Sequence, residues 1–144
     1  MRPSDLEAVM LIERRSFSAP WAENTFRGLM RRPSAVLLAA EVEGAVVGYS
    51  VAWFAADEAE LGDIAVHPDA RGRGIGEALL QRTLQEAAER GASFLYLEVR
   101  EANHEARRLY AKAGFEVVGL RKDYYSEPVE DAIVMRLELH DSAR

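Results

Sequence analysis

Cysteine is absent from this sequence. Its absence excludes a disulfide framework, a thiolate metal site and a cysteine nucleophile. His67 and His104 have no third ligand at a zinc-like spacing, so we expect no metal. Long hydrophobic runs are also missing, since no apolar stretch approaches the ~20 residues of a membrane-spanning helix. The start, Met1 to Asp5, lacks the core of a signal peptide, and the cytoplasm is the simplest expected location.

Basic residues are in the minority. The chain has 18 Lys and Arg against 24 Asp and Glu, a formal net charge of -6. Nucleic-acid binding requires a basic face, so this balance argues against a DNA or RNA partner. A length of 144 residues suits one domain, 1–144, that can bury a core without cross-links. The composition leaves the oligomeric state open.

Hydrophobic periodicity and turn residues predict an α+β fold. Ser4 and Glu7 form an expected capping box ahead of the first helix. A polar, aromatic loop is expected from Arg121 to Asp131. The strand-helix-strand unit from Glu58 to Val99 is expected to be parallel, between antiparallel flanks. The predicted helices run from about Asp5 to Ser16, Ala22 to Met30, Ile75 to Arg90 and Asn103 to Ala113. The predicted strands are Ala35 to Glu43, Ala45 to Ala55, Glu58 to Val66, Ser93 to Val99, Phe115 to Leu120 and Ile133 to Leu139.

Three glycines in six residues, within the stretch Arg71 to Gly76, separate a predicted strand from a predicted helix. Such a backbone can approach a ligand closely, and the free N–H groups at a helix start attract anions. A phosphate or pyrophosphate site is the functional interpretation, and a tight turn with solubilising arginines is the alternative. The Gly-Lys-Ser/Thr of a P-loop is missing. A dinucleotide fingerprint fits poorly because the third glycine comes one residue early, although Glu98 could serve as its ribose-binding acid.

The motif Arg71-x-x-Gly74-x-Gly76 resembles the Gln/Arg-x-x-Gly-x-Gly/Ala motif of the GNAT superfamily of acetyltransferases. Residues 61–68, 97–103 and 109–115 are similar to the neighbouring segments of that family. Pro20-Trp21 with Phe26, and the tail from Arg121 through Tyr124-Tyr125 to 130–132, resemble its RimI group, which acetylates protein N-termini. The resemblance covers nearly the whole chain. It implies a mixed, mostly antiparallel sheet with a central parallel strand-helix-strand unit and helices on both faces.

The resemblance implies acetyl-CoA as cosubstrate. The glycine-rich loop would then wrap the CoA pyrophosphate, and three strand residues would offer backbone groups to the pantetheine, with the Val66 N–H as an oxyanion donor. Asn103 is expected both to cap its helix and to contact CoA. The expected cofactor-binding residues are Ile64, Ala65, Val66, Arg71, Gly72, Arg73, Gly74, Ile75, Gly76, Glu77 and Asn103.

Two side chains are the expected catalytic groups. Glu98 ends an apolar strand, where a carboxylate is costly unless it is used, and it is the candidate base. The alternative is a strand-end glutamate paired with Arg100 or with solvent. Tyr110 is the candidate acid, because a phenol is protonated at neutral pH and can donate to the CoA sulfur. From spacing alone core packing would explain Tyr110, and the resemblance favours the catalytic role for both residues.

The resemblance also implies an acceptor, the N-terminal alanine of small-subunit ribosomal protein eighteen, acetylated by direct transfer in a ternary complex. Aromatic and acidic residues are expected to bind this peptide: Trp21, Tyr124, Tyr125, Glu130 and Asp131. Three other functions remain open at this point. The acceptor could be a lysine or a small amine, the chain could bind CoA without turnover, or it could bind a dinucleotide.

Overall fold

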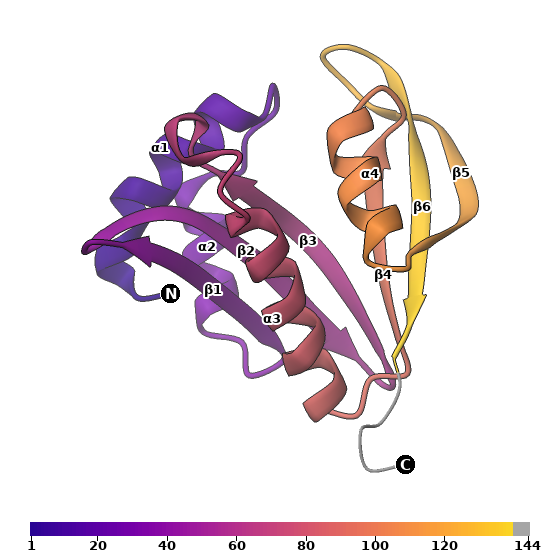
Figure 1. Cartoon of the computed structure of the whole chain (residues 1–144), viewed down its shortest axis with the longest axis horizontal. Helices are drawn as coiled ribbons and strands as arrows, with labels where there is room; N and C mark the ends of the chain where they lie inside the picture. Colours follow the sequence, from indigo (N-terminus) through magenta and orange to yellow (C-terminus); the bar gives the residue numbers. More distant parts are fainter. Residues whose placement is uncertain (140–144) are drawn as a thin grey trace.

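A computed structural model describes residues 1–139, and within them four α-helices and six strands follow one another along the chain (Figure 1). The helices are α1 (Leu6–Ser16), α2 (Glu23–Met30), α3 (Ile75–Glu89) and α4 (His104–Lys112), with short 3₁₀ helices at Pro3–Asp5 and Pro68–Ala70. The strands are β1 (Ala35–Val42), β2 (Ala45–Ala55), β3 (Glu58–Val66), β4 (Phe94–Arg100), β5 (Glu116–Tyr125) and β6 (Glu130–Glu138).

The six strands form one mixed sheet in the order β1-β2-β3-β4-β6-β5. Only β3 and β4 pair in parallel, and α3 connects them. The other four neighbouring pairs are antiparallel. The predicted α+β class, with its parallel unit between antiparallel flanks, is confirmed.

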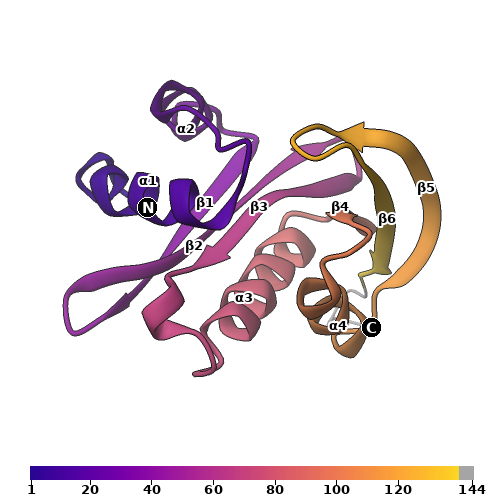
Figure 2. The ribbon, with the colours of Figure 1, turned by 90° about the horizontal axis from the view of Figure 1, so that it is seen from above.

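Helices cover both faces of the sheet, as Figure 2 shows, with α1 and α2 on one side and α3 and α4 on the other. Each side has its own apolar cluster. One cluster joins α3 and α4 to β3, β4 and β6 through residues such as Leu80, Leu95 and Tyr110. The other joins α1 and α2 to β2 through Val9, Phe26 and Tyr49. None of the helices within residues 1–139 is both long and apolar enough to cross a membrane.

The parallel pairing between β3 and β4 is short. It runs from Glu58 opposite Phe94 to Leu61 opposite Leu97, and β3 then continues to Val66 beside β2 alone. Figure 1 shows the two strands moving apart beyond this point, so that the sheet opens between β3 and β4. Backbone groups on the open side of β3 are thereby left without a strand partner.

The prediction of a loop from Arg121 to Asp131 was wrong. In the structure β5 continues to Tyr125 and β6 begins at Glu130, so that only residues 126–129 form the turn. The physical reason is that β5 is the edge strand of the sheet and most of its residues are exposed. An exposed edge strand tolerates polar residues on both faces, so the alternation that signals a strand is missing.

The expected capping box of Ser4 and Glu7 was also wrong. The chain begins its first helical turn at Pro3, and the Asp5 carboxylate accepts a hydrogen bond from the Arg2 backbone N–H at 2.7 Å. Proline is favoured at the first helical position, where its missing N–H costs nothing. The cap therefore lies two residues earlier than expected, with Asp5 in the role that was given to Glu7.

Candidate active site

The glycine-rich loop forms the N-terminal end of α3. Gly72 and Gly74 have φ values of +80° and +77°, a left-handed conformation that side chains disfavour, and Gly74 is the N-cap residue of the helix. Apart from the chain neighbours, no atom of residues 1–139 lies within 4 Å of the position that a methyl group would take at either glycine. The first N–H groups of a helix have no partner inside it. The loop therefore combines these donors with open space beside them, as an anion site requires.

The end of β3 lies beside this loop. Arg71 donates from Nε to the Val66 carbonyl oxygen at 3.2 Å, which ties the loop to the strand. Ile64, Ala65 and Val66 pair with β2 on one side, and they lie beyond the last pair with β4 on the other. The predicted backbone stretch and the predicted phosphate loop are therefore adjacent, where the sheet opens. Their contacts with CoA remain predictions.

Glu98 lies on β4, one residue beyond the last pair with β3. Its side chain is 14% exposed, and Oε1 is 3.5 Å from Nε of Arg121. Oε2 is buried and has no hydrogen-bond partner within residues 1–139. A buried carboxylate oxygen without a donor is costly, which marks this position as more than a structural one. The sequence analysis gave Arg100 or solvent as the alternative partner of Glu98, and in the structure the neighbouring cation is Arg121.

Tyr110 extends from α4 into the core, where its side chain is 6% exposed and its ring lies 5.7 Å from that of Phe115. Burial raises the pKa of Tyr110 above the usual phenol value, and the charges of Asp63 and Tyr125 act in the same direction. The hydroxyl therefore keeps its proton at neutral pH. The alternative of core packing describes the ring correctly, and the donor role of the hydroxyl stays a prediction.

Two other predicted CoA contacts also have structural partners. Asn103 caps α4, because its Oδ1 accepts a hydrogen bond from the Ala106 backbone N–H at 3.1 Å. The predicted cap is therefore confirmed, and the contact of Asn103 with CoA stays a prediction. Glu77 in the first turn of α3 lies 3.6 Å from Nζ of Lys112 on α4. This exposed pair joins the two helices that flank the opening.

Aromatic rings gather on the opposite side of the opening. Trp21 stacks on Trp53 with ring centroids 6.2 Å apart, and Trp53 donates from Nε1 to Glu60 at 2.9 Å. A methyl group at Gly62 would overlap the Trp53 ring and approach Trp21 to 3.1 Å, so only glycine fits beneath them. Sequence reasoning found Trp21 but missed Trp53 and Glu60. The available signal was Glu60 between Ala59 and Leu61, a charge on the outer face of an alternating strand.

The Trp21–Trp53 stack is one aromatic wall of the site, and Tyr124 and Tyr125 form the other. Their rings meet edge to face at 5.0 Å. Tyr124 is half exposed, and the neighbouring Glu98 carboxylate, first, and then its partial burial raise its pKa. Tyr125 lies beneath the Arg100 guanidinium at 4.5 Å, and burial together with Glu98 raises its pKa to about 12. The predicted pair therefore faces the predicted base.

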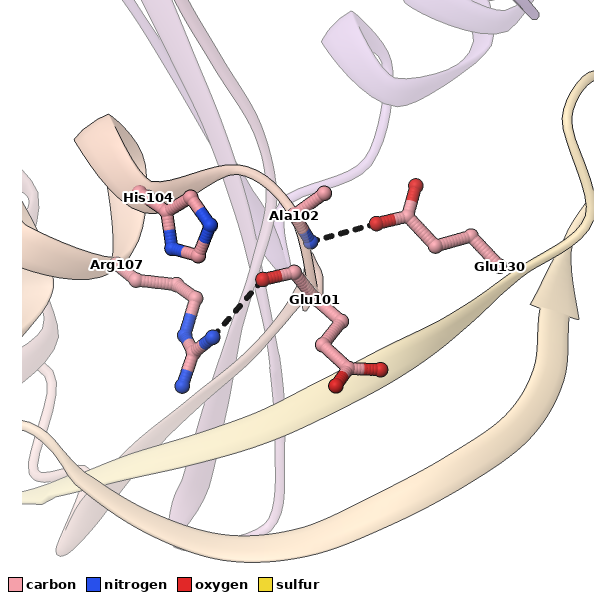
Figure 3. A pocket seen from close by; sticks show the side chains of 5 residues that line it. All are labelled: Glu101, Ala102, His104, Arg107 and Glu130. Carbon is pink, nitrogen blue, oxygen red and sulfur yellow. Dashed lines mark hydrogen bonds between the residues drawn. The ribbon is translucent and has the colours of Figure 1, made fainter.

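Arg100 connects the two walls. It donates to Ser18 Oγ at 3.3 Å, before Trp21, and to the Ser126 carbonyl at 2.9 Å, after Tyr125. It also lies 3.3 Å from Glu130. Figure 3 shows Glu130 on β6 turned toward Ala102, and Glu130 Oε2 accepts a hydrogen bond from the Ala102 backbone N–H at 2.6 Å. Asp131 Oδ1 likewise accepts a hydrogen bond from the Asp123 backbone N–H at 2.8 Å. Both acids thus hold the β5–β6 turn, and their predicted attraction for a basic peptide stays a prediction.

A small pocket lies beside this connection, between the start of α4 and β6 (Figure 3). Arg107 crosses it to donate to the Glu101 carbonyl oxygen at 2.8 Å. Glu130 is its only lining residue that the sequence had predicted for the site. The remaining residues that line it are Glu101, Ala102, His104 and Arg107.

The model of the acetyltransferase (GNAT) family matches residues 6–115. The chain belongs to this family. It is 35% identical over 141 residues to the [ribosomal protein bS18]-alanine N-acetyltransferase of Escherichia coli K12, covering 96% of this chain and 95% of that protein. A Bacillus subtilis protein provisionally named for the same activity is 37% identical, covering 98% and 94% of the two chains.

Solved structures agree. The crystal structure of the Escherichia coli ribosomal-protein-S18-alanine N-acetyltransferase superposes with a TM-score of 0.89, at 35% identity, covering 96% of this chain and 90% of that chain. The structure of Chaetomium thermophilum Naa20, solved with a bisubstrate analogue, superposes with a TM-score of 0.87 at 26% identity, and the match covers 99% of this chain and 86% of that chain. The protein is therefore an acetyl-CoA-dependent N-acetyltransferase of GNAT fold, and the dinucleotide-binding alternative was wrong.

The loop geometry gives a matched pair of glycines. Gly74 and Gly91 both have positive φ and open space around them, at opposite ends of α3. Alanine at either position should cost about 1–2 kcal/mol of folding free energy through left-handed strain. Only Gly74→Ala should also weaken acetyl-CoA binding, by roughly tenfold in Kd, or about 1.4 kcal/mol. Isothermal titration calorimetry and denaturant unfolding measure both effects. Equal acetyl-CoA affinities of the two variants would contradict a role of the loop.

Proposed function

We propose that this protein acetylates the N-terminal α-amine of a protein, and that its acceptor is the N-terminal alanine of ribosomal protein bS18. The observation that carries the proposal is the buried Oε2 of Glu98, which has no hydrogen-bond partner among the described residues and lies beside Tyr124, where β3 and β4 separate. The relatives named for this activity, matched over nearly the whole chain, support the acceptor. We place the reaction in the cytoplasm, where ribosomal proteins are made.

The chain supplies each element that acetyl transfer needs. The amine must be neutral to attack, and Glu98, directly or through one water, accepts its proton. The Val66 N–H, on the open side of β3, donates to the oxygen that becomes negative as the new C–N bond forms. When the C–S bond breaks, Tyr110 donates its proton to the departing sulfur. With no cysteine in the chain, the acetyl group passes directly to the amine.

A carboxylate base such as Glu98 is better suited to an α-amine than to a lysine side chain. A protein α-amine has a pKa near 8, and a lysine side chain one near 10.4, so the lysine is a much weaker acid at neutral pH. The half-exposed Tyr124 and the Trp21–Trp53 stack border the approach to Glu98. They provide flat apolar surfaces against which the first residues of a peptide can lie.

The loop and the adjacent strand hold the cosubstrate in this proposal. The N–H groups of residues 72–76 would bind the pyrophosphate, with Arg71 and Arg73 adding positive charge. The backbone of Ile64 to Val66 would take the pantetheine as an extra strand pairs with an open edge. Bound acetyl-CoA supplies the activated thioester.

Removing the Tyr110 hydroxyl tests the proposed acid. Tyr110→Phe keeps the buried ring, so acetyl-CoA affinity should change little while kcat falls by roughly 10²-fold, because the sulfur leaves without a proton. Steady-state kinetics and calorimetric titration separate the two effects. Phe115→Leu, which also loosens the ring contact, is the packing control and should leave kcat nearer to that of the native protein. Unchanged kcat in Tyr110→Phe would remove Tyr110 from the reaction.

The pH dependence tests the proposed base. Glu98→Gln should reduce kcat/KM most at about pH 6, where the α-amine is charged, and least at about pH 9, where it is already neutral. The pH profiles of the native protein and the variant, measured with one peptide, give the ratio. A loss of the same size at every pH would show that Glu98 positions the peptide instead of accepting its proton.

The acceptor is tested with matched peptides. One carries the bS18 N-terminus with a free alanine, a second is the same peptide with an acetylated N-terminus and an internal lysine, and a small primary amine is the third. Thiol release from acetyl-CoA, with mass spectrometry of each product, should show turnover with the first alone. Comparable rates on the lysine or the small amine would overturn the N-terminal acceptor. Binding of acetyl-CoA without transfer to any acceptor would support a non-catalytic CoA-binding protein.

A further inference from the structure

Arg100 is a charged residue at the end of a central strand. It ends β4, two residues after Glu98, so the two side chains lie on the same face of the sheet. The Arg100 side chain is only 24% exposed, and its guanidinium has lost much of its contact with water. A guanidinium carries five N–H donors, which need acceptors when water is excluded. Two separate segments of the chain provide them.

The first segment is the turn between β5 and β6, residues 126–129. Nη1 of Arg100 donates to the Pro128 carbonyl oxygen at 3.0 Å, and Nη2 donates to the Ser126 carbonyl oxygen at 2.9 Å. The two nitrogens of one planar fork therefore hold the turn at two places. The guanidinium also lies over the Tyr125 ring, 4.5 Å from its centroid, so the same group holds the aromatic wall that precedes the turn.

The second segment connects α1 to α2 and contains Trp21. We call residues 17–22 the Trp21 segment. Nη2 of Arg100 donates to Ser18 Oγ at 3.3 Å, across 82 residues of sequence. The same nitrogen thus bonds to the Trp21 segment and to the β5–β6 turn, and one side chain joins the two walls of the site.

Glu130 fixes the direction of the guanidinium. Its Oε1 accepts a hydrogen bond from Nη1 of Arg100 at 3.3 Å, while its Oε2 accepts the Ala102 backbone N–H at 2.6 Å. The Glu130 side chain is itself only 18% exposed. A carboxylate that is held at both oxygens cannot turn away, so the Arg100 fork keeps one orientation between the walls.

We propose that Arg100 is a positioning residue for the acceptor, because it fixes the separation between the Trp21 segment and the Tyr124–Tyr125 wall. That separation sets the width of the opening through which a peptide N-terminus reaches Glu98. Lysine could not replace it, since an ammonium is a single point charge without the planar fork that reaches both segments. The effect on the peptide rests on the proposed function, and the link between the two segments does not.

The first experiment measures the link in the absence of any acceptor. Arg100→Lys keeps the charge and loses the fork. Backbone order parameters from NMR relaxation should be near about 0.85 in residues 17–22 and 126–129 of the native protein, and should fall toward about 0.6 in both segments of the variant. Order parameters that fall in neither segment, or in only one, would overturn the link.

Arg107 supplies the matched control. It also donates from its guanidinium to a backbone carbonyl oxygen, that of Glu101 at 2.8 Å, but it lies on α4 and joins neither wall. Arg107→Lys should therefore leave the order parameters of both segments at their native values. An equal fall in the two variants would show that any loss of a guanidinium has this effect, and would also overturn the link.

The second experiment measures the consequence for the acceptor. In Arg100→Lys the KM for the N-terminal peptide should rise by roughly tenfold, because several charge-assisted bonds are lost together. The kcat at saturating peptide and the Kd for acetyl-CoA should stay close to the native values, and the unchanged Kd shows that the variant is folded. A fall in kcat with an unchanged peptide KM would overturn the positioning role.

A double-mutant cycle isolates the bond between the walls. Ser18→Ala removes the acceptor of that bond and should raise the peptide KM by roughly threefold in the native protein. In Arg100→Lys the same substitution should have no further effect, since the bond is already lost. Equal effects of Ser18→Ala in the two proteins would show that Ser18 acts independently of Arg100, contrary to the proposal.

These experiments separate this inference from the proposed function. If the native protein acetylates no N-terminal peptide, the proposed function fails, and the order parameters still decide whether Arg100 links the two segments. If the peptide is acetylated but Arg100→Lys keeps the native peptide KM, the proposed function stands and the positioning role is wrong.

Discussion

The separation of β3 from β4 is the constraint on which the rest of the structure depends. Parallel pairing ends at Leu61 and Leu97, yet both strands continue, because β2 supports β3 and β6 supports β4. An unpaired backbone is costly when it is buried, so an opening of this kind persists only where water or a ligand supplies the missing partners. The start of α3, which follows β3 after a 3₁₀ turn and the glycine-rich loop, brings its free N–H groups to the same place. One break in one strand pair thus supplies both an open strand edge and an anion site.

The acceptor side requires a different solution, since its walls come from opposite ends of the chain. The Trp21 segment connects α1 to α2, and the Tyr124–Tyr125 pair ends β5. Arg100, on β4 between them, bonds to both segments. Glu13 secures the first wall from the core side, as Glu130 secures the second through Arg100 and the Ala102 N–H. Charged groups with several partners are well suited to this task, because their directional bonds fix positions that apolar contacts leave free to slide.

The sequence predicted the parts of the molecule that follow from local pattern. Gly74 and Gly91 indicated the ends of α3, Asn103 indicated the start of α4, and the apolar alternation located β3 and β4. It failed along β5, where exposure at the sheet edge removes the pattern. It also missed Glu13, an ordinary acidic residue by composition that becomes distinctive only when α1 packs on the sheet, where its carboxylate accepts hydrogen bonds from the Trp21 backbone N–H and the Tyr49 hydroxyl. Partnerships between distant charged residues depend on the tertiary structure, and no spacing rule in one sequence encodes them.

The central claim is that backbone amides at the β3–β4 opening hold acetyl-CoA. Amide hydrogen exchange, followed by NMR with and without acetyl-CoA, tests it most directly because it reports on each N–H group separately. The account predicts slower exchange at residues 64–66 and 72–76 on binding, with much smaller changes in the β1–β2 hairpin at the far edge of the sheet. Acetyl-CoA binding that protects other amides and leaves these two segments unchanged would contradict it.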